Sequence, residues 1–224
     1  MSNISEMVSM WIRRSPFIEE ALDEGLINVS SLARKMQKEI SIQLKMEVQI
    51  GAIVMAIQRR NPGPYKKVNN KLHKFFSSLG DLSVRSGISE FTYMNSKTLF
   101  FKQGKMLEEL VKASGVSFCA FSQGVAETTI ILSDDLIAYQ KKIMKSEKLL
   151  NTVSGLASVT IRMKEENMHI SGIYYFILQR LAWAGINIIE VISTTREFTL
   201  VIKEKDTDLC FSQLLKLKRD FSNK

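Results

Sequence analysis

The chain repeats one stretch of its own sequence seventy residues further on, without a gap. The first copy, residues 117–132, reads "SFCAFSQGVAETTIIL", and the second, residues 187–202, reads "NIIEVISTTREFTLVI". A glycine stands two residues before each copy. Nearly every apolar position matches an apolar position, the main exception being Thr128 against Phe198. An ungapped match of this length indicates a duplicated folding unit.

The hydrophobic pattern around each copy predicts the same order of elements: a strand, a helix, two strands and a second helix. In the first copy these occupy residues 81–94, 97–115, 117–132 and 133–150, and in the second residues 155–163, 172–185, 187–202 and 208–221. This order is a ferredoxin-like unit without its last strand. Because a unit without its last strand leaves a sheet edge open, we expect the missing strand of at least one unit to come from elsewhere in the chain.

The N-terminal part of the chain has the apolar spacing of helices instead. We predict three of them, at residues 6–25, 28–45 and 48–60, the first ending at Gly25 and the second capped by Asn28 or Ser30. The sequence "NPGP" at 61–64 is the strongest helix breaker in the chain, and a basic helix follows it.

The expected organisation therefore has four parts. These are a helical domain at residues 1–62, a basic connecting helix at 63–79, a first α+β unit at 80–150 and a second at 151–224.

The net charge of +8 is concentrated in one region. Between residues 34 and 74 there are ten basic side chains and only two acidic ones, Glu39 and Glu47. Such a concentration suggests a polyanionic partner. A solvated basic helix face is the alternative explanation.

Several classes of protein lack support in the sequence. No phosphate-binding loop, nucleophile elbow or dinucleotide fingerprint occurs, and His73 and His169 have no metal-ligand spacing, so we expect no enzyme, no cofactor and no metal site. No apolar run is long enough for a membrane helix, and the N-terminus has no signal-peptide pattern. Cys119 and Cys210 lie in apolar runs, which predicts buried thiols in the cytosol.

Residues 155–202, "GLASVTIRMKEENMHISGIYYFILQRLAWAGINIIEVISTTREFTLVI", resemble an ACT domain, the small-ligand sensing module of amino-acid regulation. They are similar to the second regulatory copy of aspartokinases, and "FSQGVAETTIIL" in the first copy resembles the same regions. The resemblance implies an α+β fold: tandem ferredoxin-like (βαββαβ, ACT-type) units with antiparallel sheets, here preceded by a small all-helical domain. In the aspartokinase arrangement an earlier strand completes the second unit, and Gly80–Arg85 is positioned to do so. No kinase domain is present in the sequence.

The resemblance also implies a ligand site, because ACT pairs bind small amino acids around the loop between the first strand and the first helix. A helix N-terminus can receive an α-carboxylate, and a glycine allows close backbone approach. The residues carried over to this chain are His169, Ile170, Ser171, Gly172, Ile173, Asn187, Ile188, Ser193 and Thr194, with Thr195 and Glu197 in the same turn.

The first copy departs from that pattern. Its loop "YMNSKTLFF" has no glycine and adds Lys97, and Ser117 stands where the second copy has Asn187. This departure argues against a ligand site in the first copy and favours a role in pairing.

The N-terminal helices resemble a compact helix-turn-helix or winged-helix domain, with "VQIGAIVMAIQRR" as recognition helix. The nucleic-acid contacts that this resemblance implies are Lys45, Gln49, Gln58, Arg59, Arg60, Lys66 and Lys67. A protein-docking bundle is the alternative, because the predicted recognition helix is mostly apolar and base readout needs exposed polar side chains.

Together these observations predict a cytoplasmic, non-enzymatic amino-acid sensor that dimerises through its ACT sheets. Its ligand would change the spacing of the N-terminal domains on DNA. The alternatives are a regulatory subunit that docks on an amino-acid biosynthetic enzyme, or an ACT pair that has lost its ligand and only dimerises.

Overall fold

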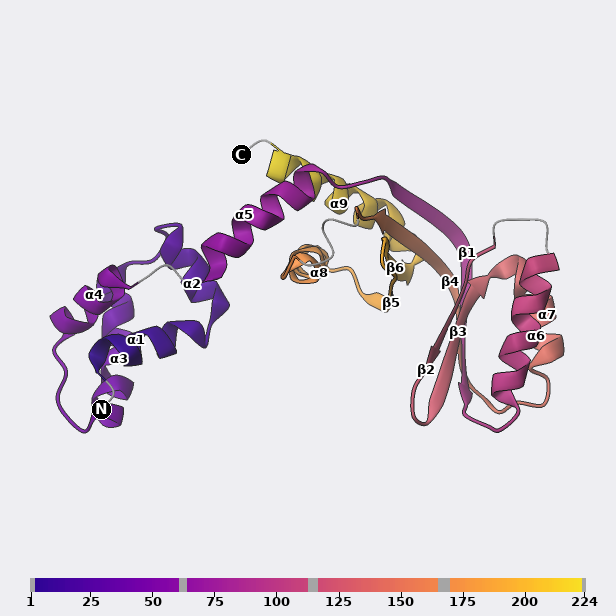
Figure 1. The fold of residues 1–224 in the computed structure, drawn as a ribbon, viewed down its shortest axis with the longest axis horizontal. Coiled ribbons are helices and arrows are strands. Elements are labelled where there is room, and N and C mark those ends of the chain that lie inside the picture. Colours follow the sequence, from indigo (N-terminus) through magenta and orange to yellow (C-terminus); the bar gives the residue numbers. More distant parts are fainter. Residues whose placement is uncertain (1–2, 61–63, 113–116, 165–169, 223–224) are drawn as a thin grey trace. The chain divides into compact units, whose positions relative to one another are not determined.

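The computed structural model describes residues 3–60, 64–112, 117–164 and 170–222. The chain forms two compact units, residues 1–74 and 75–224 (Figure 1). The α5 helix (Pro64–Ser77) crosses the division between them. Within the described residues, no helix is long and apolar enough to cross a membrane.

The N-terminal unit is a bundle of α1 (Ile4–Arg13), α2 (Pro16–Asp23), α3 (Val29–Leu44) and α4 (Ile50–Arg59) around one apolar core. The α3 helix begins after Asn28, whose side chain accepts a hydrogen bond from the Ser31 amide at 2.9 Å. Glu39 of α3 ties α1 to the bundle. It accepts from the indole of Trp11 at 2.7 Å and pairs with Arg14 at 2.6 Å.

The single helix predicted for residues 6–25 is wrong, because the structure divides this segment at Ser15. Ser15 has an extended backbone, as expected for a residue that precedes proline, and Pro16 occupies the first position of α2. The segment ends as predicted, with Gly25 in the left-handed region at φ 73°.

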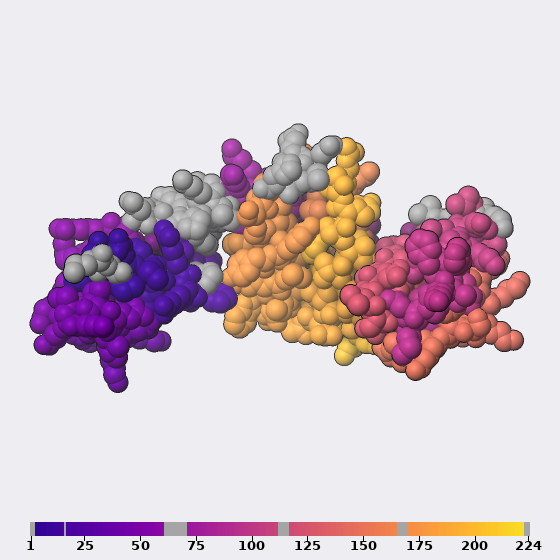
Figure 2. Space-filling view, turned by 60° about the horizontal axis from the view of Figure 1, so that its bottom comes forward, coloured from indigo at the N-terminus to yellow at the C-terminus, as the bar shows by residue number. Residues whose placement is uncertain are grey.

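The C-terminal unit contains one antiparallel six-stranded sheet with strand order β2-β3-β1-β4-β6-β5. Its strands are β1 (Leu82–Met94), β2 (Cys119–Gln123), β3 (Glu127–Ser133), β4 (Leu149–Arg162), β5 (Ile188–Ser193) and β6 (Glu197–Lys203). Its helices are α6 (Leu99–Lys112), α7 (Ile137–Ile143), α8 (Ile173–Trp183) and α9 (Thr207–Ser222), with short 3₁₀ turns η1 (Asp134–Leu136) and η3 (Glu204–Asp206). The α8 and α9 helices lie side by side (orange and yellow in Figure 2).

Two long strands serve both repeats of the sheet. The second part of β1 pairs with β3, whereas its first part, Leu82–Arg85, pairs only with Ser158–Ile161 of β4. The first part of β4 pairs with β1 alone, and its last part pairs with β6. Each repeat therefore has the four strands of a ferredoxin-like unit, and each receives its fourth strand from the other repeat's long strand.

A glycine marks the change of partner in each long strand. Gly87 in β1 and Gly155 in β4 both have φ 66°, and the β1–β4 register shifts between Arg85 and Ile88. Left-handed glycines of this kind bend a strand and increase its twist. Ile88 and Leu156 follow the two glycines and pack with Ile131 and Val201 in a buried cluster on the sheet.

The helix predicted for residues 133–150 is too long. The α7 helix ends at Ile143, and β4 already begins at Leu149, so the expected boundary between residues 150 and 151 falls inside β4. Leu149 and Leu150 are apolar and follow a helical pattern, and only their pairing with β1 makes them a strand.

The predicted fold class is confirmed: an α+β protein with ferredoxin-like repeats on an antiparallel sheet, preceded by a helical region. The breaker at residues 61–63 and the predicted helix end at Gly115 lie outside the described residues.

Gly80, which precedes β1, gives a test of the strand exchange. A Cβ added at Gly80 would overlap the backbone carbonyl oxygen of Arg162, which is the last residue of β4. Because backbone cannot move as a flexible side chain can, we expect Gly80→Ala to lower the free energy of unfolding by about 1–3 kcal/mol. Urea unfolding of the full chain measures this.

Gly104→Ala is the matched control. Gly104 lies in the middle of α6 with no atom within 4 Å of an added Cβ, so alanine there should raise stability by about 0.5–1 kcal/mol. Equal effects of the two substitutions would contradict the close approach of residue 80 to the end of β4.

Candidate functional site

A pocket of about 430 Å³ opens in the second repeat, at the start of α8. Its lining residues come from the end of β4, the segment before α8, the first turn of α8 and the turn between β5 and β6: Met163, Ile170, Ser171, Gly172, Ile173, Tyr174, Tyr175, Thr194 and Thr195. This volume lies in the usual range for small-molecule sites, and none of these nine residues is charged.

Backbone hydrogen bonds hold the two sides of the pocket. The Met163 amide donates to the Arg196 carbonyl at 2.7 Å, which fastens the end of β4 to the β5–β6 turn. The Thr194 amide donates to the Glu197 carbonyl at 2.8 Å and closes that turn. The Thr194 and Thr195 side chains are therefore presented on a turn of defined shape.

Gly172 sets the direction in which α8 enters the pocket. It is the N-cap of α8 and has φ 93°, a left-handed conformation that glycine adopts without steric cost. Its carbonyl accepts the first helical hydrogen bond from the Phe176 amide at 3.1 Å. The first amide groups of a helix have no acceptor within the helix, and together with the helix dipole they favour an anionic group at this end.

An aromatic stack fixes Tyr174 at the pocket. Its ring lies on Phe198 of β6 with centroids 4.6 Å apart and planes 17° from parallel. Its hydroxyl hydrogen-bonds with the hydroxyl of Ser193 at 2.7 Å. The first turn of α8 is thus joined to both strands of the β5–β6 hairpin, and the lining combines backbone amides, hydroxyl groups and apolar surface.

The residues carried over from the ACT resemblance have different positions in the structure. Ile170, Ser171, Gly172, Ile173 and Thr194 border the pocket. Ser193 does not border it but hydrogen-bonds with Tyr174, which does.

The other three predicted ligand residues do not contribute to the lining that the structure describes. Asn187 is exposed, and the backbone of Ile188 pairs with Ile202. His169 lies outside the described residues.

The sequence reasoning missed Met163, Tyr174 and Tyr175. Tyr174 and Tyr175 stand in an apolar helical run, which predicts burial, yet both are more than a third exposed. The stack of Tyr174 on Phe198 is visible only once α8 lies across β6.

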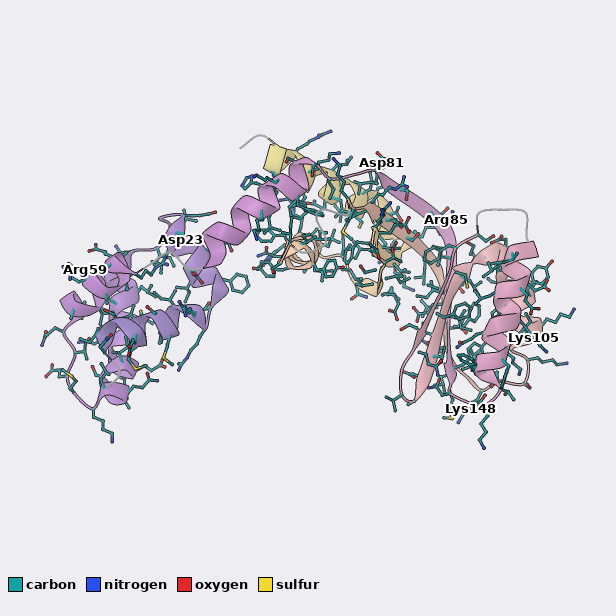
Figure 3. The ribbon with its side chains drawn as sticks, in the orientation of Figure 1. Asp23, Arg59, Asp81, Arg85, Lys105 and Lys148 are labelled. Atoms are coloured by element: carbon teal, nitrogen blue, oxygen red, sulfur yellow. The ribbon has the colours of Figure 1, made fainter. Side chains whose placement is uncertain are left out.

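The predicted nucleic-acid residues lie in the N-terminal unit. Gln58 and Arg59 are exposed on α4, Gln49 is its N-cap, and Lys45 ends α3 in a left-handed conformation at φ 54°. The side chains of Lys66 and Lys67 lie outside the described part of the chain. Figure 3 shows Arg59 at the outer side of this unit.

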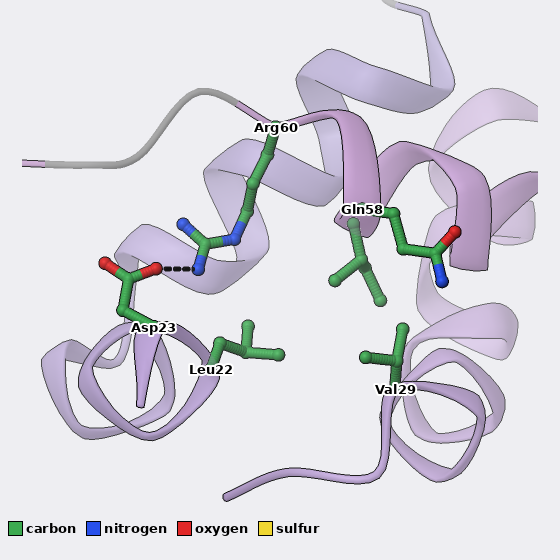
Figure 4. Close-up of a pocket in the computed structure, with 6 residues that line it drawn as sticks. Leu22, Asp23, Val29, Gln58 and Arg60 are labelled. Atoms are coloured by element: carbon green, nitrogen blue, oxygen red, sulfur yellow. Dashed lines mark hydrogen bonds and ion pairs between the residues drawn. The ribbon is translucent and has the colours of Figure 1, made fainter. Parts of the chain in front are cut away.

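Arg60 differs from the other predicted contacts, because it forms an ion pair with Asp23 and its side chain is only 12% exposed. The pair borders a second pocket of about 320 Å³ (Figure 4), together with Leu22, Val29, Ile57 and Gln58. The positive charge of Arg60 is therefore neutralised by Asp23 within the helical unit.

The bundle as a whole is close to neutral. Residues 3–60 contain eight basic and seven acidic side chains, whereas residues 64–77 contain four lysines and no acidic residue. The concentration of charge between residues 34 and 74 therefore owes half of its excess to the sequence of α5.

The two cysteines are unsuited to nucleophilic chemistry. Burial raises the pKa of Cys119 to about 12, although the residue is only half-buried, and burial together with the charge of Asp206 raises the pKa of the buried Cys210 to about 11. Both thiols are therefore protonated near neutral pH. Among the described residues, no group of three or more His, Cys, Asp and Glu side chains could hold a metal ion.

No protein-family model matches the chain, and no curated protein matches it significantly. Solved structures do match. The ligand-free regulatory subunit of aspartate kinase from Thermus thermophilus has a TM-score of 0.51 and 10% sequence identity, over 62% of this chain and 98% of that subunit.

Two whole aspartate kinases match over the same share of this chain, 62%. The enzyme from Clostridium acetobutylicum has a TM-score of 0.51 and 14% identity, and the one from Synechocystis has a TM-score of 0.50 and 12% identity. The match covers 34% and 27% of those two chains. At these identities the likeness shows the fold alone: the chain contains the fold of a complete aspartate kinase regulatory subunit.

Proposed function

We propose that this protein is a cytosolic, non-enzymatic regulator that binds a small amino acid in the pocket at the start of α8. The observation that carries the proposal is the meeting of a left-handed Gly172, the first turn of α8 and the Thr194–Thr195 turn around one cavity of about 430 Å³. The aspartate kinase regulatory fold supports the same assignment.

The pocket offers a partner for each part of an amino acid. The α-carboxylate lies at the start of α8, where amide groups and the helix dipole stabilise negative charge. The α-ammonium group lies toward the β5–β6 turn, whose hydroxyl and carbonyl oxygens are acceptors. Met163 and Ile170 supply an apolar surface for a short side chain.

Ligand binding would act through the arrangement of the two repeats. The pocket is bordered by the end of β4, and β4 also supplies the fourth strand of the first repeat. A ligand that binds one arrangement more tightly shifts the population toward it, typically by about 1–3 kcal/mol of coupling free energy. We propose a homodimer formed through the sheets, with β2 and β5 as the edge strands available for pairing.

Transcriptional regulation is the form of output that one feature of the N-terminal unit favours. The α4 helix follows α3 after a short turn, and it exposes Gln49, Met55, Gln58 and Arg59. Exposed amide and guanidinium groups on one helix are suited to base and phosphate contacts. Docking of the helical unit on an amino-acid biosynthetic enzyme is the alternative output.

A thermal-shift panel of the twenty amino acids tests the ligand proposal. We expect amino acids of one chemical class to raise the midpoint temperature of unfolding, because a ligand that binds only the native state stabilises it by mass action. Thr195→Trp, which fills the pocket from its turn, should abolish the shift. Val125→Trp is the matched control at the corresponding turn of the first repeat and should preserve it. A flat panel for the wild-type protein would contradict amino-acid sensing.

Fluorescence anisotropy with duplex DNA across a salt series tests the transcriptional output. Phosphate contacts predict an affinity that falls steeply with salt, and Arg59→Gln should reduce the slope of the log–log plot by about 1. Arg13→Gln, an exposed arginine on α1, is the control and should leave the slope unchanged. Absence of binding at low salt would exclude DNA and leave the docking alternative.

A further inference from the structure

The helix start in the first repeat that corresponds to α8 is already in contact with a carboxylate of the chain itself. Glu147, in the loop between α7 and β4, accepts hydrogen bonds from Ser96 at 2.6 Å, Thr98 at 2.7 Å and Lys102 at 2.6 Å. Ser96 and Thr98 precede α6, and Lys102 lies in its first turn. The Ser96 hydroxyl also accepts from the Leu99 amide at 3.1 Å, which caps α6.

This carboxylate is enclosed and charged. The Glu147 side chain is 3% exposed and that of Lys102 is 18% exposed. The hydrogen bond from Lys102, followed by that from Ser96, lowers the pKa of Glu147 to about 2 against the opposing effect of burial. Charge-assisted hydrogen bonds of this length are the strong ones, so the group is held in one position.

The other side of the corresponding space is also engaged by the chain. Asn95 follows β1 as Met163 follows β4, and both make the same bond to the hairpin turn: the Asn95 amide donates to the Ala126 carbonyl at 3.0 Å. The Asn95 side chain then donates to the carbonyl oxygens of Gly124 and Val125 at 2.8 and 3.2 Å. Its oxygen accepts from Thr128 at 2.6 Å.

The two repeats differ in the length of the connection from the first strand to the first helix. Met94 and Arg162 are equivalent strand ends, since each pairs with the glutamate that begins the neighbouring strand. From there the chain reaches α6 within residues 95–98, but it reaches α8 only after residues 163–172. The short connection brings the start of α6 against the loop that carries Glu147.

We propose that Glu147 is a built-in carboxylate ligand that closes the first repeat, so that each chain has one amino-acid site, in the second repeat. The claim of one amino-acid site per chain rests on the proposed function, whereas the role of Glu147 does not depend on it. An intramolecular carboxylate does not have to be taken up from solution, so the first repeat stays closed whatever the amino-acid supply.

The position of Glu147 gives this closure a mechanical role. The Met94 amide donates to the Lys148 carbonyl at 3.0 Å, and β4 begins at the next residue. We call the hydrogen bonds of Glu147 with Ser96, Thr98 and Lys102 the clamp. The β4 strand starts beside this clamp and ends at Arg162, next to Met163 of the pocket. The first repeat is thus a fixed support, and the second repeat is the part that responds to ligand.

Chemical rescue tests the carboxylate site. In Glu147→Ala the site is emptied, and we expect a lower unfolding midpoint that acetate or propionate restores by about 3 °C relative to chloride at equal ionic strength. Wild-type protein and Glu108→Ala, which removes an exposed glutamate of α6, should show no such difference between the salts. Equal responses of all three proteins would overturn the proposal.

A milder pair of variants keeps the test valid if Glu147→Ala does not fold. Lys102→Met removes one hydrogen-bond donor to Glu147. Lys105→Met changes an exposed lysine of the same helix, labelled in Figure 3. Carboxyl carbon-13 NMR should find the pKa of Glu147 raised only in Lys102→Met. A wild-type pKa near the ordinary value for glutamate would contradict the clamp.

Calorimetric titration then counts the sites. One amino acid per chain supports the proposal, and two per chain would overturn it even if the rescue succeeds. If no amino acid binds, the proposed function fails, while the rescue by acetate still decides the role of Glu147.

The charge of Glu147 also predicts a pH dependence. Its pKa is lowered in the folded protein, so it contributes stability above about pH 4.5 that is lost as the pH falls toward about 2. The difference in unfolding midpoint between wild type and Glu147→Gln should be full at neutral pH and should shrink across that window. A difference that stays constant down to about pH 2 would contradict the charged clamp.

Discussion

The exchange of strands between the two repeats is the constraint on which the rest of the C-terminal unit depends. A βαββα segment leaves one sheet edge without a partner, and an open edge is a site for aggregation. In this chain the first part of β1 completes the second repeat and the first part of β4 completes the first. Neither repeat can therefore form its full sheet alone.

The two repeats differ at the start of their first helix. In the first repeat Ser96, Thr98 and Lys102 bind Glu147, and in the second repeat a pocket opens at the start of α8. The helix start is the common element: in the first repeat its side chains bind Glu147, and in the second its first amides and dipole favour a carboxylate. In one repeat the chain supplies that carboxylate, and in the other we propose that an amino acid does.

Sensing and output would then belong to different parts of the chain. The pocket lies within residues 75–224, and the exposed side chains of α4 lie within residues 1–74. The α5 helix connects the two, and its lysines account for half of the basic excess noted between residues 34 and 74. A regulator of this kind needs only a differential affinity of its ligand for two arrangements, without any catalytic group.

The sequence by itself determined the duplication, the order of elements in both repeats and the position of Ser171 and Gly172 at a helix start, because periodicity and capping are local properties. Only the tertiary structure decided that Leu149 is a strand residue, that Tyr174 stacks on Phe198 and that Glu147 meets Lys102. Each of these depends on a partner far away in the chain. A side chain's neighbour across a sheet or a loop leaves no trace in the pattern around that side chain, so long-range pairing had to be observed.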